Sequence, residues 1–188
     1  MPELSPETAC LVLIDLQEGI VSRPAEPRPA AEVVATGKAL AARFRAAGAP
    51  VVLVRVVFAP DFSDAPPGRT DQPIPRPEGG LPAGFGTLVE GLEHPGDLVV
   101  TKRNWGAFYG TDLDMLLRRR GIRSVVVGGI ATNFGVESTV RQAWERGYDV
   151  LVAEDACAGP AADMHEMAMT RIFPRLCRVT TSAEIAFA

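Results

Sequence analysis

Residues 124–153 read SVVVGGIATNFGVESTVRQAWERGYDVLVA and carry the pattern that decides the fold. Ser124–Ile130 is a valine-rich apolar run, typical of a strand that is covered on both faces. Val136–Arg146 follows as a helix, which Gly147 ends, and Tyr148–Ala153 is a second apolar run. Two such runs joined by a helix predict a βαβ unit, and therefore a parallel sheet.

The same alternation extends over the rest of the chain. Further strands are predicted at Cys10–Leu16, Val51–Phe58, Asp97–Thr101 and Arg178–Thr180, and further helices at Ala30–Ala47, Thr111–Arg120 and Ala161–Phe173. The 188 residues are close to the length of one domain, and they contain no internal repeat or linker. We therefore expect an α/β fold in a single domain over residues 1–188.

Composition narrows the range of partners. The net charge of −4 offers no concentrated positive surface for a nucleic acid. No apolar run approaches the roughly 20 residues that span a bilayer, so no membrane partner is expected. Cys10, Cys157 and Cys177 are odd in number and widely spaced, which does not suit a disulfide framework or a zinc site. A reducing, cytoplasmic location fits them best.

Residues 60–96 interrupt the regular pattern. They hold half of the 16 prolines and seven of the 18 glycines, so regular structure should be sparse there. A connection of this length in a compact domain is typically a binding loop or lid, unless an element has been assigned wrongly. We favour the lid.

Polar residues at the carboxyl ends of three predicted strands are the first candidates for a site, because ligands of parallel sheets bind at that edge. Asp15 ends the first apolar run, Lys102 follows the third strand, and Thr132–Gly135 follow the fourth. The two opposite charges are expected to meet in one cleft, either as a functional pair or as a salt bridge that holds the strand ends together. The turn after the fourth strand could offer free backbone N–H groups to an anion.

Other candidate motifs give weaker indications of a functional site. Gly135 begins GVEST, which has a threonine where a nucleophile elbow needs its second glycine. His165 has no second histidine at metal-ligand spacing and is expected at the surface or in a helix cap, so no metal site is predicted. Trp105, Phe108 and Tyr109 follow Lys102 and could form an aromatic wall for a ligand, or belong to the core or a subunit interface.

With these residues located, the chain resembles the isochorismatase-like hydrolases, also called the cysteine hydrolases. The segments that carry the resemblance are LVLIDLQEGI (11–20), TKRNWGAFYGTDLDMLLRRRGI (101–122), VVVGGIATNFGVESTVRQAWERGYDVLVAEDACA (125–158) and RVTTSAEI (178–185). They stand in the family's order and at its spacing. The resemblance implies a three-layer α/β/α, Rossmann-like fold around a six-stranded parallel sheet. It also implies a homodimer or homotetramer, no cofactor, and a small-molecule substrate.

Most members of this family use an Asp, Lys and Cys triad, in which the cysteine attacks an amide or carbamoyl carbon. Asp15 and Lys102 match the first two positions. The family pattern T-x-x-C-V falls on Thr132–Val136, so the resemblance puts Gly135 at the position of the cysteine. The expected substrate-binding residues are Gln17, Trp105, Phe108, Tyr109, Ala131, Thr132, Asn133 and Phe134.

A chain without that cysteine resembles the isochorismatases proper, which cleave a vinyl ether without a covalent intermediate. Asp15 would then protonate the methylene carbon of an enolpyruvyl group, and Lys102 would orient Asp15 or bind a substrate carboxylate. Two alternatives stay open. Asp15 could activate water for an amide or carbamoyl hydrolase, or the protein could be an inactive relative that only binds a small molecule.

Overall fold

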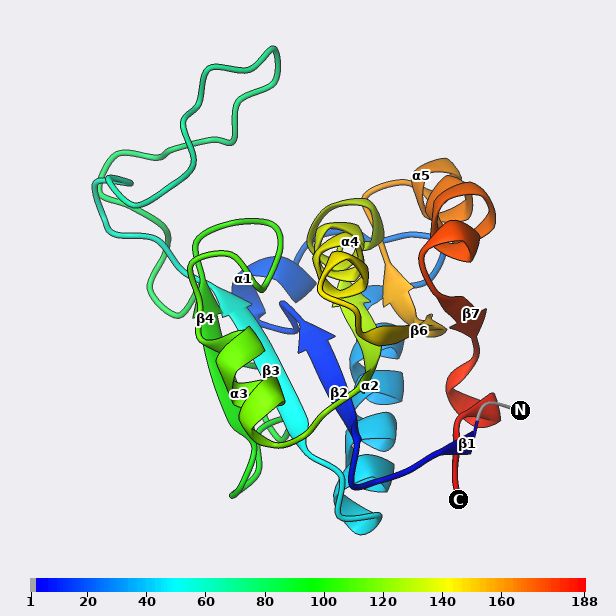
Figure 1. Cartoon of the computed structure of the whole chain (residues 1–188). Coiled ribbons are helices and arrows are strands. Elements are labelled where there is room, and N and C mark those ends of the chain that lie inside the picture. Colours follow the sequence, from blue (N-terminus) through cyan, green and yellow to red (C-terminus); the bar gives the residue numbers. More distant parts are fainter. Residues whose placement is uncertain (1–2) are drawn as a thin grey trace.

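The computed structural model describes residues 3–188, and the first two residues of the predicted domain lie outside the described residues. A parallel sheet of six strands in the order β4-β3-β2-β5-β6-β7 forms its centre, as predicted (Figure 1). The strands are β2 (Ala9–Ile14), β3 (Val51–Val56), β4 (Leu98–Lys102), β5 (Ser124–Ile130), β6 (Asp149–Ala158) and β7 (Arg178–Thr180).

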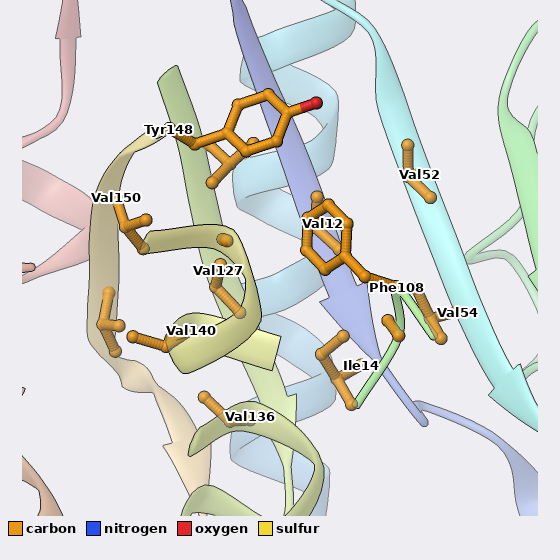
Figure 2. Packing of buried hydrophobic residues seen from close by; sticks show 14 of the residues in the cluster. Val12, Ile14, Val52, Val54, Phe108, Val127, Val136, Val140, Tyr148 and Val150 are labelled. Carbon is orange, nitrogen blue, oxygen red and sulfur yellow. The ribbon is translucent and has the colours of Figure 1, made fainter. Parts of the chain in front are cut away.

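Alternating side chains of the strands build two cores, one on each face of the sheet. Leu11 and Leu13 of β2 pack on the face that α2 covers, while Val12 and Ile14 point to the opposite face (Figure 2), where they share a core with residues of α3 and α4. The helices are α1 (Glu18–Val21), α2 (Ala30–Ala46), α3 (Leu113–Arg119), α4 (Glu137–Glu145) and α5 (Ala162–Met167). The result is the expected three-layer α/β/α arrangement.

The strand order places a switch point between β2 and β5. From β2 the chain continues to β3 on one side, whereas β5 continues to β6 on the other. Connections leave in opposite directions at such a point, so a crevice opens between the carboxyl ends of the two strands. Asp15 and the residues after Ile130 lie at this crevice.

Several elements differ from the sequence-based expectation. The predicted helix over 161–173 is divided into α5, a π-helical turn (Ala168–Ile172) and a 3-10 turn (Phe173–Arg175) that contains Pro174. Two features are not predicted from the sequence: α1, and a second, two-stranded parallel sheet of β1 (Glu3–Leu4) and β8 (Ala186–Phe187). Strands of two residues are too short for an alternating pattern to predict them.

The proline-rich connection is irregular, as predicted. Residues 57–97, all of which the structure describes, contain no helix or strand, and part of this connection extends well away from the sheet (Figure 1). The connection is attached to the rest of the domain at Gln17, which forms an isolated β-bridge with Leu88. Among residues 3–188, no helix has the length and apolar character needed to cross a membrane.

Gly129 is predicted to be indispensable for stability. Its φ of +127° suits glycine, and a Cβ atom there would lie 2.1 Å from the carbonyl oxygen of Ile14 on β2. Gly129→Ala should lower the free energy of unfolding by at least about 3 kcal/mol, because backbone strain and overpacking add. Gly147→Ala is the matched control: φ is +77°, but no atom lies within 4 Å of the added Cβ. It should cost only about 1 kcal/mol, and equal losses in urea unfolding would contradict the close-approach argument.

Candidate active site

Asp15 stands at the switch point in a strained backbone conformation. The sequence places it inside the first strand, but β2 ends at Ile14, and Asp15 has a φ of +53°. Its N–H donates to the carbonyl oxygen of Val54 at 2.8 Å, and its own carbonyl accepts from the N–H of Gln17 at 2.8 Å. Residues other than glycine are uncommon in this left-handed region, and those that adopt it cluster at functional sites. The turn aims the Asp15 side chain beyond the sheet edge.

Asp15 and Lys102 form a buried ion pair. Lys102 is the last residue of β4, and its Nζ lies 2.8 Å from Oδ2 of Asp15. The same Nζ donates to the carbonyl oxygen of Asn104 at 3.0 Å. The expected meeting of the two charges therefore occurs. In the described part of the chain, Oδ1 of Asp15 is buried without a hydrogen-bond partner, so this carboxyl oxygen retains unused hydrogen-bonding capacity.

Burial makes Asp15 a much weaker acid than an ordinary aspartate. Desolvation raises the pKa of its carboxyl group to about 6, although the charge of Lys102 and its hydrogen bond pull in the opposite direction. The carboxyl can therefore change its protonation state close to neutral pH, which suits a general acid or base.

The turn after β5, residues 131–136, forms the other side of the crevice. Thr132–Val136 is π-helical and leads directly into α4. The N–H groups of Phe134 and Val136 both donate to the carbonyl oxygen of Ala131 at 3.1 Å. Those two groups are therefore not free for an anion, because the tight turn satisfies them internally.

Gly135 faces Asp15 directly. A Cβ atom built on it would lie 3.3 Å from Oδ2 of Asp15 and 2.9 Å from Cγ2 of Ile14. A side chain at this position would thus point at the carboxylate of the buried pair.

A cavity of about 1750 Å³ opens above this crevice, between the sheet edge and the connection over 57–97. Asp15, Lys102 and Gly135 line its floor. Trp105 and Phe134 line it too, with ring centroids 4.8 Å apart, and both rings are partly exposed. Together they form an aromatic wall on which a planar or cyclic ligand could pack.

Other residues predicted to bind substrate lie elsewhere. Phe108 is part of the core, where its ring packs with Tyr148 near β2 and β3 (Figure 2). Tyr109 is 69% exposed and lies outside the cavity wall. Gln17 is completely buried: its side chain donates to the carbonyl oxygens of Val56 and Phe85 at 2.9 Å and accepts from the N–H of Val56 at 2.7 Å. Gln17 therefore fastens the long connection to β3.

Ala131 lines the cavity, but the two residues after it point away. Thr132 is completely buried, and its hydroxyl lies 2.8 Å from Nδ1 of His165. The side-chain amide of Asn133 donates to the sulfur of Met164 at 3.2 Å. The expectation for His165 is wrong: it is 3% exposed rather than at the surface. Spacing along the chain does not indicate the hydrogen-bond partners of His165, because Thr132 and Glu154 belong to other elements.

The cysteines lie outside the cavity wall. Burial raises the pKa of the Cys157 thiol to about 12 and that of Cys10 still further, so neither is a ready thiolate. Burial also raises the pKa of Cys177, which is partly buried, to about 12. Among residues 3–188, no group of three or more His, Cys, Asp or Glu side chains is placed to hold a metal ion.

Comparisons with known proteins agree with this architecture. Residues 9–184 match the family described as Isochorismatase domain. The uncharacterized isochorismatase family protein YecD of Escherichia coli O157:H7 is 46% identical over 190 aligned residues, which cover 98% of each chain. An isochorismatase family protein of Burkholderia thailandensis has a solved structure that superposes with a TM-score of 0.93 at 46% identity, covering 98% of this chain and 96% of the other.

A relative with a named reaction is more distant. The ureidoacrylate amidohydrolase RutB of Methylobacterium radiotolerans is 34% identical, over 90% of this chain and 74% of its own length.

Proposed function

The chain belongs to the isochorismatase family of hydrolases, and from that premise we propose that it hydrolyses a vinyl ether of a small, cyclic carboxylated metabolite, without a covalent intermediate. The observation that carries this proposal is Asp15: a buried carboxyl group in the cavity floor, with a pKa raised to about 6 and one unpartnered oxygen. Such a group can be protonated near neutral pH, as an acid catalyst must be.

In the proposed reaction, Asp15 transfers its proton to the methylene carbon of the enolpyruvyl group. Water then adds to the resulting oxocarbenium carbon, and the hemiketal collapses to pyruvate and an alcohol. Lys102 is held by Asp15 and by the Asn104 carbonyl, so its role is to orient Asp15 and to stabilise the carboxylate once the proton has left. Trp105 and Phe134 would receive the ring of the substrate.

We propose further that Gly135 occupies the position at which most members of the family carry the nucleophilic cysteine. The placement of its missing side chain, 3.3 Å from Oδ2 of Asp15, supports this assignment. The other thiols lie outside the cavity wall. A reaction without a covalent thioester follows from these two observations.

A second candidate function is amide or carbamoyl hydrolysis, which the amidohydrolase among the relatives favours. Here Asp15 would act as a base that takes a proton from the attacking water. A base must be charged, whereas the acid of the vinyl-ether reaction must be protonated, so the two reactions require opposite states of the same carboxyl group.

The pH dependence of turnover separates these two reactions. With a pKa of about 6 for Asp15, vinyl-ether hydrolysis should fall as pH rises above about 6, and approach a tenfold loss per pH unit. Amide hydrolysis should instead rise through the same pH and level off above it. The measurement follows pyruvate from isochorismate, and separately ammonia from ureidoacrylate and a panel of primary carboxamides, between pH 5 and 9.

Pyruvate release with the falling profile supports the acid role. If stoichiometric enzyme releases no pyruvate, the vinyl-ether proposal is wrong, and ammonia release with the rising profile supports the second candidate. Absence of both products, with tight binding of a small carboxylic acid, would indicate a binding protein.

A further inference from the structure

A chain of four polar side chains lies behind the cavity wall, and neither candidate reaction uses it. The hydroxyl of Thr132 lies 2.8 Å from Nδ1 of His165, and Nε2 of His165 lies 3.0 Å from Oε1 of Glu154. The same Oε1 accepts from Nη2 of Arg28 at 2.6 Å. The chain thus links the turn after β5, α5, β6 and the segment before α2.

The first three groups have the order hydroxyl, imidazole, carboxylate that nucleophilic hydrolases use. Thr132, however, is completely buried and does not line the cavity, so no substrate can reach its oxygen. A carboxylate beside Nε2 requires a proton on that nitrogen, and the Thr132 hydroxyl completes the hydrogen bonding of the ring at Nδ1. The imidazole of His165 therefore serves as a fixed hydrogen-bonded link between Thr132 and Glu154.

The two ends of the chain hold two different walls of the cavity. Thr132 belongs to the turn whose Ala131, Phe134 and Gly135 line the cavity together with Asp15. Arg28 follows the segment over 22–25, which also lines the cavity, and its Nη1 donates to the carbonyl oxygens of Glu154 and Cys157 at 2.9 and 2.5 Å.

Next to this chain, Glu26 and Gly159 exchange two backbone hydrogen bonds of 2.8 Å. Glu154 is the centre of the arrangement: although burial opposes it, the hydrogen bonds from Arg28 and His165 hold its pKa below the ordinary value. The carboxylate therefore remains charged and bound to both partners near neutral pH.

We propose that Thr132, His165, Glu154 and Arg28 form a positioning network that keeps these two cavity walls aligned around Asp15. Its effect on turnover rests on the proposed function, because a shift of the turn would move Phe134 and Gly135, which line the cavity together with Asp15. A displacement of about 1 Å at a reacting group can cost up to about 100-fold in rate.

The test compares Thr132→Val, which keeps the shape but removes the hydroxyl, with Thr132→Ser, which keeps the hydroxyl. In Thr132→Val, deuterium exchange of the amides in 131–136 should rise about tenfold, while that of β2 stays unchanged. With isochorismate, kcat should fall by about 10- to 100-fold, and KM should change by less than about threefold. Thr132→Ser should restore the wild-type exchange and kcat.

Glu154→Gln is the second variant, in case Thr132→Val does not fold. Glu154 lies on the other side of His165 from Thr132 and is only partly buried. Its replacement should change amide exchange and kcat in the same direction as Thr132→Val.

Equal impairment of the serine and valine variants would contradict the proposal, because methyl packing rather than the hydroxyl would then matter. Faster exchange in an active enzyme with unchanged kcat would also overturn it. If the wild type releases no pyruvate, the proposed function has failed, and the exchange measurement alone decides whether the network holds the turn.

Discussion

Asp15→Asn is expected to reduce pyruvate release by about 100- to 10,000-fold, which is the usual contribution of a positioned general acid. The amide has nearly the shape of the carboxyl group and can still accept a hydrogen bond from Lys102, but it has no proton of suitable acidity to give to carbon. The loss should therefore appear in kcat, with little change in KM. Steady-state kinetics with isochorismate at pH 6 measures both.

Asp64→Asn is the matched control for this variant. Asp64 also pairs with a cation, Arg103, but it is solvent-exposed and lies outside the cavity wall. Its replacement should leave turnover unchanged, since an exposed pair contributes little. Thermal unfolding verifies that both variants remain folded. Unchanged kcat in Asp15→Asn would remove Asp15 from the mechanism.

Gly135→Cys is expected to give the protein a reactive thiol that it lacks. The new Cβ would stand 3.3 Å from Oδ2 of Asp15. Above the pKa of about 6, Asp15 is charged and can take the thiol proton. Attack on an amide carbonyl would then expel ammonia and leave a thioester. Intact-mass spectrometry after incubation with the amide panel should show the added acyl group, which the wild type should not acquire.

Gly135→Ala is the control that separates the effect of the thiol group from the effect of the added side-chain volume. Both variants bring the new Cβ to 2.9 Å from Cγ2 of Ile14. Both should therefore lose about 1–3 kcal/mol of unfolding free energy through overpacking, but only the cysteine variant should form the adduct. If neither the amides nor iodoacetamide label the introduced thiol, the site does not activate a nucleophile at position 135.

The parallel pairing of the strands could be predicted because it depends on local patterns. The apolar runs at 124–130 and 148–153, with a helix between them, have one stable parallel arrangement, and the observed β5, α4 and β6 follow it. The ion pair of Asp15 and Lys102 could be predicted for a related reason, since the carboxyl ends of parallel strands lie at one edge of the sheet.

The roles of individual side chains around the site are harder to predict from the sequence. Trp105 and Phe108 are three residues apart in one irregular segment, yet the first lines the cavity and the second lies in the core. Irregular backbone has no periodicity from which to derive the direction of a side chain. His165 was misplaced because both of its partners are distant in the sequence.

The sequence by itself determined the alternation of the main strands and helices, the position of Asp15 and Lys102 at the carboxyl ends of parallel strands, and the absence of cysteine from the segment that follows β5. These features depend on residue type and spacing along the chain. Only the tertiary structure decided that Asp15 loses enough water for its pKa to rise despite Lys102, and that Thr132 points away from the cavity toward His165. Desolvation and buried hydrogen bonds are sums over atoms from many distant segments, so they exist only once the chain has packed.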